Sequence, residues 1–219
     1  MEVKKETSNL NEIIFETKNL SFNNMIQYKD IQIKEGKVNF IIGKSGTGKS
    51  TLLRLFNGTL SPSDGSIFYN GNDILQMDTI TLRKEVLLIS QSVYLFDESI
   101  EDNFKEFYGY RDMAEPSQEV MMEFLKLCCI PFPLDKDCTT MSGGEKQRVY
   151  IAIYLSFLPK VIMLDEPTSA LDKENSNDVI ENLITFAKGK GTTVIIVSHD
   201  PKLTEKFAEE VINIERSVE

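Results

Sequence analysis

The chain has no long apolar run and no apolar segment at its start. No stretch approaches the roughly 18–20 apolar residues that a membrane-spanning helix needs. Residues 1–12, MEVKKETSNLNE, form a polar N-terminal extension without the apolar core of a secretory signal. We therefore expect a protein that stays in the cytoplasm and does not itself cross a membrane.

Basic residues and cysteines are also scarce. The chain has 24 Lys and Arg against 34 Asp and Glu, a formal net charge of −10, which argues against nucleic acid as a partner but leaves room for an anionic nucleotide. The cysteines Cys128, Cys129 and Cys138 lack the spacing of metal ligands. We expect Cys128 and Cys129 to be core residues on a helix, in a reducing compartment.

Short apolar runs alternate with helical patterns along the 219 residues. This order predicts an α/β fold with a parallel sheet, helices on both of its faces, and antiparallel strands near the N-terminus. In particular, 30–34 and 37–42 flank Glu35-Gly36 and are expected to pair as a hairpin. The expected strands are 13–22, 30–34, 37–42, 66–69, 86–90, 161–164, 193–197 and 210–215.

The middle of the chain is mainly helical in character. Residues 93–158 contain the expected helices 99–107 and 117–129, and a further helix follows MSGG at 141–144. We interpret this stretch as a helical subdomain inserted into a single domain that covers 13–219.

A glycine-rich segment, GKSGTGKS, follows the expected strand 37–42 and opens a helix that ends near Gly58. In this context it matches the phosphate loop GxxxxGK[ST], in which backbone N–H groups and the helix N-terminus surround phosphates. We predict that Lys49 reaches the β- and γ-phosphates and that the Ser50 hydroxyl lies on Mg²⁺. The predicted nucleotide-binding residues of this loop are Gly43, Lys44, Ser45, Gly46, Thr47, Gly48, Lys49, Ser50 and Thr51.

Polar residues follow three of the expected strands, at the edge where parallel sheets bind ligands. Asp165 is expected to be the second group on the metal side, and Glu166 the base that accepts a proton from the attacking water. Gln91 offers an amide to Mg²⁺ or to that water. His199, the one histidine of the chain, is expected near the γ-phosphate.

A second serine and glycine site, MSGGEKQR, occupies 141–148. Ser142 and Glu145 have the spacing of a capping box, so a capped helix and nothing more is the plain alternative. Glycine is a poor helix former, however, and Gly143 and Gly144 both stand in the first turn. We expect both to lie at an exposed helix end, where a ligand approaches the backbone closely.

Taken together, these motifs resemble the ATP-binding subunit of an ABC transporter over about residues 13–214. They are GKSGTGKS, Gln91, MSGGEKQR, VIMLDE at 161–166, SALD at 169–172 and His199. The resemblance implies a P-loop NTPase core, ATP and Mg²⁺ as ligands, and two copies paired head-to-tail around two ATP. It implies that Ser142 and Gly144 act on the nucleotide of the other copy, and that Asp172 belongs to a loop linking the two sites. It also makes Glu166 the catalytic base and His199 a switch residue.

Two positions depart from the pattern of this family. Met141 replaces the usual Leu, which is an apolar exchange of similar volume. Asn24 stands near the place where the family has a tyrosine that stacks on adenine. Phe22 is our candidate for that contact, with a core role as the alternative, and Tyr28 is the less favoured candidate.

The partner is expected to be a separate membrane permease, which would hold the chain on the cytoplasmic face of the membrane. Residues 92–104, SVYLFDESIEDNF, resemble loops that dock such a permease, with Val93, Tyr94, Leu95 and Phe96 as the candidates. Other segments are similar to small bacterial ATPases of iron or metal export. The alternative is a soluble ATPase of a cytosolic assembly complex, of the iron–sulfur scaffold type.

Overall fold

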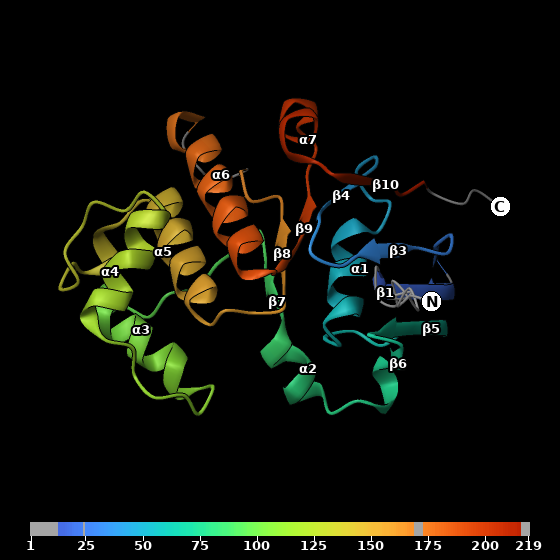
Figure 1. The fold of residues 1–219 in the computed structure, drawn as a ribbon, viewed down its shortest axis with the longest axis horizontal. Coiled ribbons are helices and arrows are strands. Elements are labelled where there is room, and N and C mark those ends of the chain that lie inside the picture. Colours follow the sequence, from blue (N-terminus) through green and yellow to red (C-terminus); the bar gives the residue numbers. More distant parts are fainter. Residues whose placement is uncertain (1–12, 24, 169–172, 216–219) are drawn as a thin grey trace, which may run out of the picture.

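A computed structural model describes residues 13–23, 25–168 and 173–215 (Figure 1). The N-terminal extension 1–12, Asn24 and the SALD segment with Asp172 lie outside these ranges, so their predicted roles have no structural counterpart here. Within the described ranges, no helix is long and apolar enough to cross a bilayer.

The centre of the fold is a parallel sheet with strand order β10-β4-β9-β8-β7. Every strand pair in it is parallel, as the sequence predicted. Strands β8 and β9 are buried at all five positions, which explains their unbroken apolar runs. The bounds are β4 Val38–Ile42, β7 Val86–Ile89, β8 Val161–Asp165, β9 Thr193–Val197 and β10 Glu210–Asn213.

A second sheet of antiparallel strands lies beside the first. Its strands are β1 Ile13–Phe22, β2 Ile26–Gln27, β3 Gln32–Lys34, β5 Asp64–Tyr69 and β6 Asn72–Asp73. Strands β5 and β6 form a hairpin around Asn70 and Gly71, as the expected turn indicated.

The predicted hairpin of 30–34 with 37–42 is wrong. Strand β3 pairs with β1, whereas β4 leaves for the centre of the parallel sheet between β10 and β9. The two strands differ in burial, since β3 exposes two of its residues and β4 is buried along most of its length. Because β4 is covered on both faces it fits the centre of the parallel sheet, whereas the half-exposed β3 fits the antiparallel sheet.

Helix α1 Lys49–Phe56 lies between the two sheets (Figure 1). Leu52, Leu53, Leu55 and Phe56 join one apolar cluster with β1, β3 and β5 and with one face of the parallel sheet. Asn57 caps the helix, and Gly58 follows in a left-handed conformation, as the expected stop at Gly58 indicated. The helix N-terminus, which carries the phosphate loop, is thereby fixed at the carboxyl end of β4.

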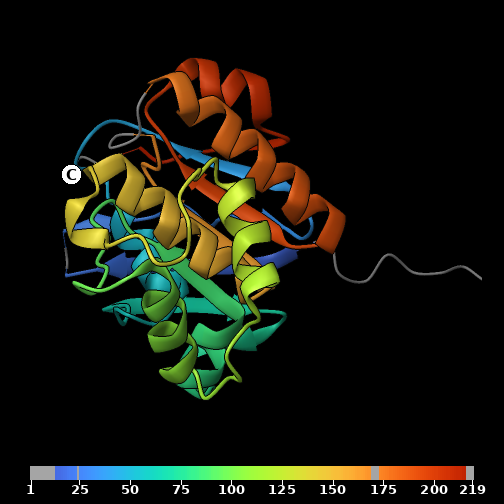
Figure 2. The ribbon, with the colours of Figure 1, turned by 90° about the vertical axis from the view of Figure 1, so that its left-hand side faces the viewer.

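The other face of the parallel sheet packs on helices α3 to α6, which face the viewer in Figure 2. Their bounds are α3 Ile100–Gly109, α4 Gln118–Leu127, α5 Gly143–Ser156 and α6 Lys173–Lys190. Serines cap α3, α4 and α5. The short helices α2 Thr79–Glu85 and α7 Pro201–Phe207 were not predicted.

Cys128 is a core residue as expected, but neither Cys128 nor Cys129 lies within the helix. Helix α4 ends at Leu127, with Cys128 as its buried C-cap. Cys129 follows in a left-handed conformation with φ 55° and is partly exposed. Pro131 comes shortly after, and Ile130 before it is driven away from helical angles, so the helix cannot continue.

Candidate functional site

The loop 43–48 joins β4 to α1 and depends on its glycines at two points. Gly43 has φ +150°, and a Cβ there would lie 2.3 Å from the carbonyl oxygen of Ile214. Gly48 has φ +95°, and a Cβ there would lie 2.7 Å from the Tyr28 hydroxyl. The backbone therefore passes its neighbours too closely for any side chain at either position.

Lys49 begins α1 and is only 5% exposed. Its Nζ donates to the carbonyl oxygens of Gly43 at 2.9 Å and Lys44 at 3.0 Å. Burial lowers the pKa of Lys49, and the nearby carboxylates of Glu166 and Asp165 act against that shift. The loop thus folds around one ammonium group that faces two acids.

Ser50 and Asp165 come together from the first turn of α1 and the last residue of β8. The Ser50 hydroxyl donates to Asp165 Oδ1 at 2.9 Å. A hydroxyl and a carboxylate are the hard oxygen ligands that Mg²⁺ prefers beside phosphate groups. The pair therefore fits the predicted magnesium site.

Glu166 and His199 form a second contact at the same edge of the sheet. Glu166 Oε1 lies 3.1 Å from His199 Nε2, which is also 3.1 Å from Lys49 Nζ. Glu166 has φ +52°, and its N–H donates to the Val197 carbonyl at 3.0 Å. A non-glycine residue in the left-handed region is strained, and such strain gathers at functional sites.

A pocket of about 480 Å³ collects half of the predicted site residues. Gln91 reaches it from the segment after β7. Gly43 and Lys44 contribute through the carbonyl groups that hold Lys49. The pocket is lined by Ile26, Ser45, Gly46, Gly48, Lys49, Ser50, Thr51, Gln91, Glu166 and His199.

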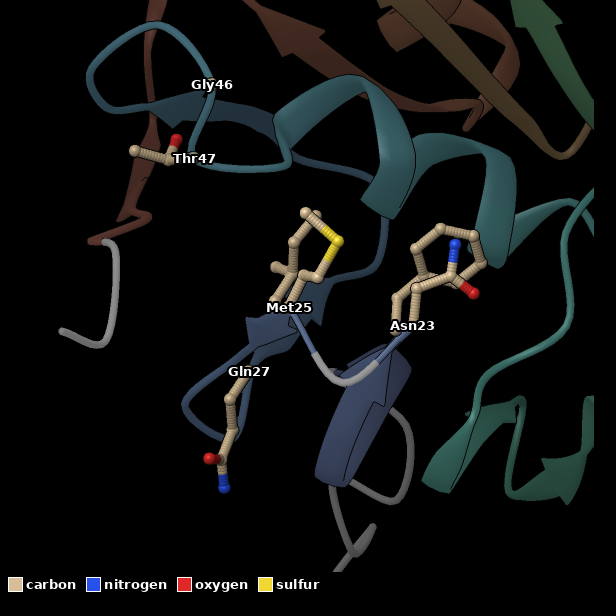
Figure 3. A pocket seen from close by; sticks show the side chains of 7 residues that line it. Asn23, Met25, Gln27, Gly46 and Thr47 are labelled. Carbon is tan, nitrogen blue, oxygen red and sulfur yellow. The ribbon is translucent and has the colours of Figure 1, made fainter. Parts of the chain in front are cut away.

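A second cavity of about 250 Å³ adjoins the first and shares Ile26 and Gly46 with it. It is lined by Phe22, Asn23, Met25, Ile26, Gln27, Gly46 and Thr47. In Figure 3, Met25 projects from the turn after β1 toward the loop, while the Gln27 amide points away. Sequence reasoning missed Met25, although it stands three residues after Phe22.

Tyr28 is not part of this cavity wall. It is buried, and its hydroxyl donates to the Gly48 carbonyl oxygen at 2.8 Å. Its ring is therefore packed under the loop and is not free to stack on a base.

Ser142 caps α5 as predicted. Its hydroxyl accepts from the Glu145 N–H at 3.3 Å, and its own N–H donates to Glu145 Oε2 at 2.7 Å. These hydrogen bonds lower the pKa of Glu145. The helix end is exposed at Ser142 and Gly143, whereas Gly144 behind them is buried because α5 packs into the core. Within the described part of the chain, residues 142–144 do not line the pocket.

The segment after Gln91 divides its apolar residues between core and surface. Leu95 is buried and Val93 packs against the core. Tyr94 is 65% exposed. The ring of Phe96 packs edge-on against it, with 5.2 Å between the two ring centroids. The buried Asn103 amide of α3 holds both backbone groups of Phe96, accepting from its N–H at 2.8 Å and donating to its carbonyl at 3.1 Å.

Comparison with known proteins agrees with this geometry. The sequence pattern of a family described as ABC transporter matches residues 26–169, more than half of the chain. The chain belongs to the ABC transporter family. Its fold is the expected P-loop NTPase core, with a parallel sheet and added antiparallel strands.

Several ABC transporter proteins resemble the chain over most of its length. It is 33% identical over 187 residues to the probable iron export ATP-binding protein FetA of Escherichia coli, covering 85% of this chain and 82% of that protein. It is 35% identical over 191 residues to the energy-coupling factor transporter ATP-binding protein EcfA2 of Clostridium perfringens, covering 83% and 66%. These relatives confirm the similarity to ABC ATPases, including those of iron export.

A solved structure supports the same assignment. The structure of cbiO1 from Clostridium perfringens, part of the ABC transporter complex cbiONQ, superposes with a TM-score of 0.81 at 30% identity, covering 94% of this chain and 86% of that one. The chain is therefore an ATP-binding subunit of an ABC transporter system.

Proposed function

We propose that the chain hydrolyses ATP as a head-to-tail dimer and thereby drives a separate membrane permease from the cytoplasmic face of the membrane. The observation that carries the proposal is the meeting of Lys49, the Ser50–Asp165 pair and the Glu166–His199 pair in one pocket. Residues from about 93 to 158 act in this proposal as the helical subdomain that passes movement to the permease.

The loop binds the phosphates of ATP in this mechanism. Backbone N–H groups of 45–51 and the N-terminus of α1 favour negative charge, and Lys49 adds a full positive charge. Ser50 and Asp165 would hold Mg²⁺, with Gln91 at the same pocket as a further oxygen ligand. The ion, when bound, neutralises charge on the β- and γ-phosphates.

Hydrolysis uses the acid that directly follows β8. Glu166 accepts a proton from the attacking water, and His199 beside it holds the γ-phosphate end of the pocket. Ser142 and Gly143 are exposed, with the buried Gly144 behind them, at a helix end that does not line the pocket of its own chain. A second copy would present this helix end to the γ-phosphate, and Asp172 would link the two sites.

The cavity beside the loop is the proposed base site. Phe22 would contact the adenine ring on one side and Met25, which is 74% exposed, would cover it. A thioether and an aromatic ring read a base by its shape and polarisability, without donors or acceptors for its edge. Asn23 and Thr47 add polar atoms to the cavity lining, but the Gln27 amide points away, so we infer weak selection between adenine and guanine.

Replacing Phe22 with Ala should weaken ATP binding about five- to tenfold, the loss expected for one aromatic stacking contact. Binding of tripolyphosphate, which has no base, should not change. Isothermal titration with each ligand in Mg²⁺ buffer measures both constants.

Phe68→Ala is the matched control, because Phe68 is a partly exposed aromatic on β5 outside this cavity. If Phe22→Ala binds ATP as tightly as the parent, Phe22 has only a structural role in the core. GTP binding more than about a hundredfold weaker than ATP binding in the parent would contradict weak base selection.

The proposed contact for the permease is formed by the exposed Tyr94 and the partly exposed Phe96. Replacing Tyr94 and Phe96 together with Ala should lower recovery of a membrane partner about tenfold, because exposed aromatics dominate the energy of such contacts. The measurement is affinity capture of the tagged chain from native membranes in mild detergent with ATP, followed by mass spectrometry.

Ile80→Ala is the control, since Ile80 on α2 has the same 65% exposure as Tyr94. A multi-span membrane protein that is lost only with the Tyr94 and Phe96 variant supports the transporter. If the parent chain captures soluble proteins alone, the cytosolic assembly ATPase becomes the better interpretation.

A further inference from the structure

Tyr28 makes a contact that the proposed reaction does not yet use. It follows β2 and is 4% exposed, and its ring belongs to the apolar cluster around α1. Its hydroxyl donates to the Gly48 carbonyl oxygen at 2.8 Å. Burial raises the pKa of this hydroxyl well above its usual range, so the group remains a donor.

The carbonyl of Gly48 is held by two donors. Besides the Tyr28 hydroxyl, it accepts the N–H of Leu52 at 2.8 Å, the first hydrogen bond of α1. The Gly48 carbonyl and the Lys49 N–H belong to the same peptide bond. This bond is trans and planar, so the two groups point in opposite directions. That N–H is one of the free donors at the helix start, directed to the side where anions bind.

Gly48 gains from such a restraint. It has φ +95° and no side chain of its own to fix its angles. The space beside its Cα is filled by the Tyr28 hydroxyl and by Ile26, whose Cγ2 would lie 2.9 Å from a Cβ. The segment that contains Ile26 also lines the base cavity, so one short stretch contacts both parts of the nucleotide site.

We propose that Tyr28 is a positioning residue of the phosphate loop. Its hydroxyl holds the peptide between Gly48 and Lys49 in the orientation that presents the Lys49 N–H to phosphate. Its place directly after the base-cavity segment makes it the link between the base side and the phosphate side of the site. This inference rests on the proposed ATP site.

A merely structural role makes a different prediction, and Tyr69 separates the two. Tyr69 is 1% exposed, belongs to the same apolar cluster, and donates its hydroxyl to Glu85 Oε2 at 3.0 Å. Removing either hydroxyl breaks one part-buried hydrogen bond, so both changes should lower the melting temperature. Only the loss at Tyr28 should change phosphate binding.

The test compares Tyr28→Phe, Tyr69→Phe and the parent by isothermal titration with ATP, ADP and tripolyphosphate in Mg²⁺ buffer. Tyr28→Phe should bind all three about fivefold more weakly, the effect of one hydrogen bond. Tyr69→Phe should bind them as the parent does. Circular dichroism and a melting curve of each variant establish that it is folded before its titration.

Three outcomes are distinct. Parent-like binding of all three ligands by Tyr28→Phe overturns the inference and leaves the proposed function standing. A loss for ATP and ADP but not for tripolyphosphate overturns it too, because the residue would then act on the base. A parent chain that binds neither ATP nor tripolyphosphate contradicts the proposed function itself.

Discussion

Replacing Glu166 with Gln should lower the rate of ATP hydrolysis about a hundredfold or more while leaving ATP binding intact. General-base catalysis contributes roughly 10²–10⁴ to a rate, and an amide cannot accept the proton of the attacking water. The two side chains have the same shape, so the contact with His199 and the left-handed backbone of residue 166 can persist. Phosphate release measures the rate, and titration measures the binding.

The same variant should accumulate as an ATP-bound dimer. If ATP closes two copies and hydrolysis opens them, a chain that cannot hydrolyse remains closed. Light scattering behind a size-exclusion column, with and without Mg-ATP, measures the mass. Glu181→Gln, an exposed acid on α6 that pairs with Lys206, is the control and should stay monomeric after turnover. Hydrolysis by Glu166→Gln at the parent rate would remove Glu166 from its proposed role.

A mixture of two inactive variants should recover about a quarter of the parent rate. Lys49→Ala removes the loop ammonium, and Ser142→Arg blocks the serine that would act on the nucleotide of the other copy, so each variant alone should be inactive. In a head-to-tail dimer, a mixed pair contains one site with an intact Lys49 and an intact Ser142. Half of the dimers in an equal mixture are mixed, and each of these has one working site of two.

The activity of the mixture shows whether Ser142 acts on the pocket of its own chain or on the pocket of the other copy. If Ser142 served the pocket of its own chain, every chain in the mixture would carry a lesion and the mixture would stay inactive. Ser117→Arg is the control, because Ser117 caps α4 in the same way that Ser142 caps α5. It should lose a comparable cap without losing the rate.

The sequence was informative where local chemistry determines local structure. The unbroken apolar runs of β8 and β9 and the alternation in β1 have the predicted positions. The Ser142–Glu145 capping box was recognised before α5 because a capping side chain satisfies free backbone donors of its own helix, and the expected helices 99–107 and 117–129 begin at serines that cap α3 and α4. The residues of the phosphate pocket were found because parallel strands bring their carboxyl ends to one edge.

Other features depend on partners far away in the chain. Nothing within 30–42 says that β3 joins β1 while β4 joins β10, since both strands have short apolar patterns. Helix α7 did carry a local signal, Asp200 followed by Pro201 at the first helical position, which sequence reasoning overlooked. The contact of Tyr28 with Gly48 joins the two sheets' loops across the fold and has no local signature.

The left-handed backbone of Glu166 has a consequence for anyone who engineers this chain. Glutamate adopts φ +52° at a cost of about 1 kcal/mol, whereas asparagine and glycine enter that region more readily. A selection for heat resistance alone would therefore reward replacing the very side chain that removes the proton from water. Libraries built to stabilise the protein should hold position 166 constant, because thermostability and turnover compete there for the same residue.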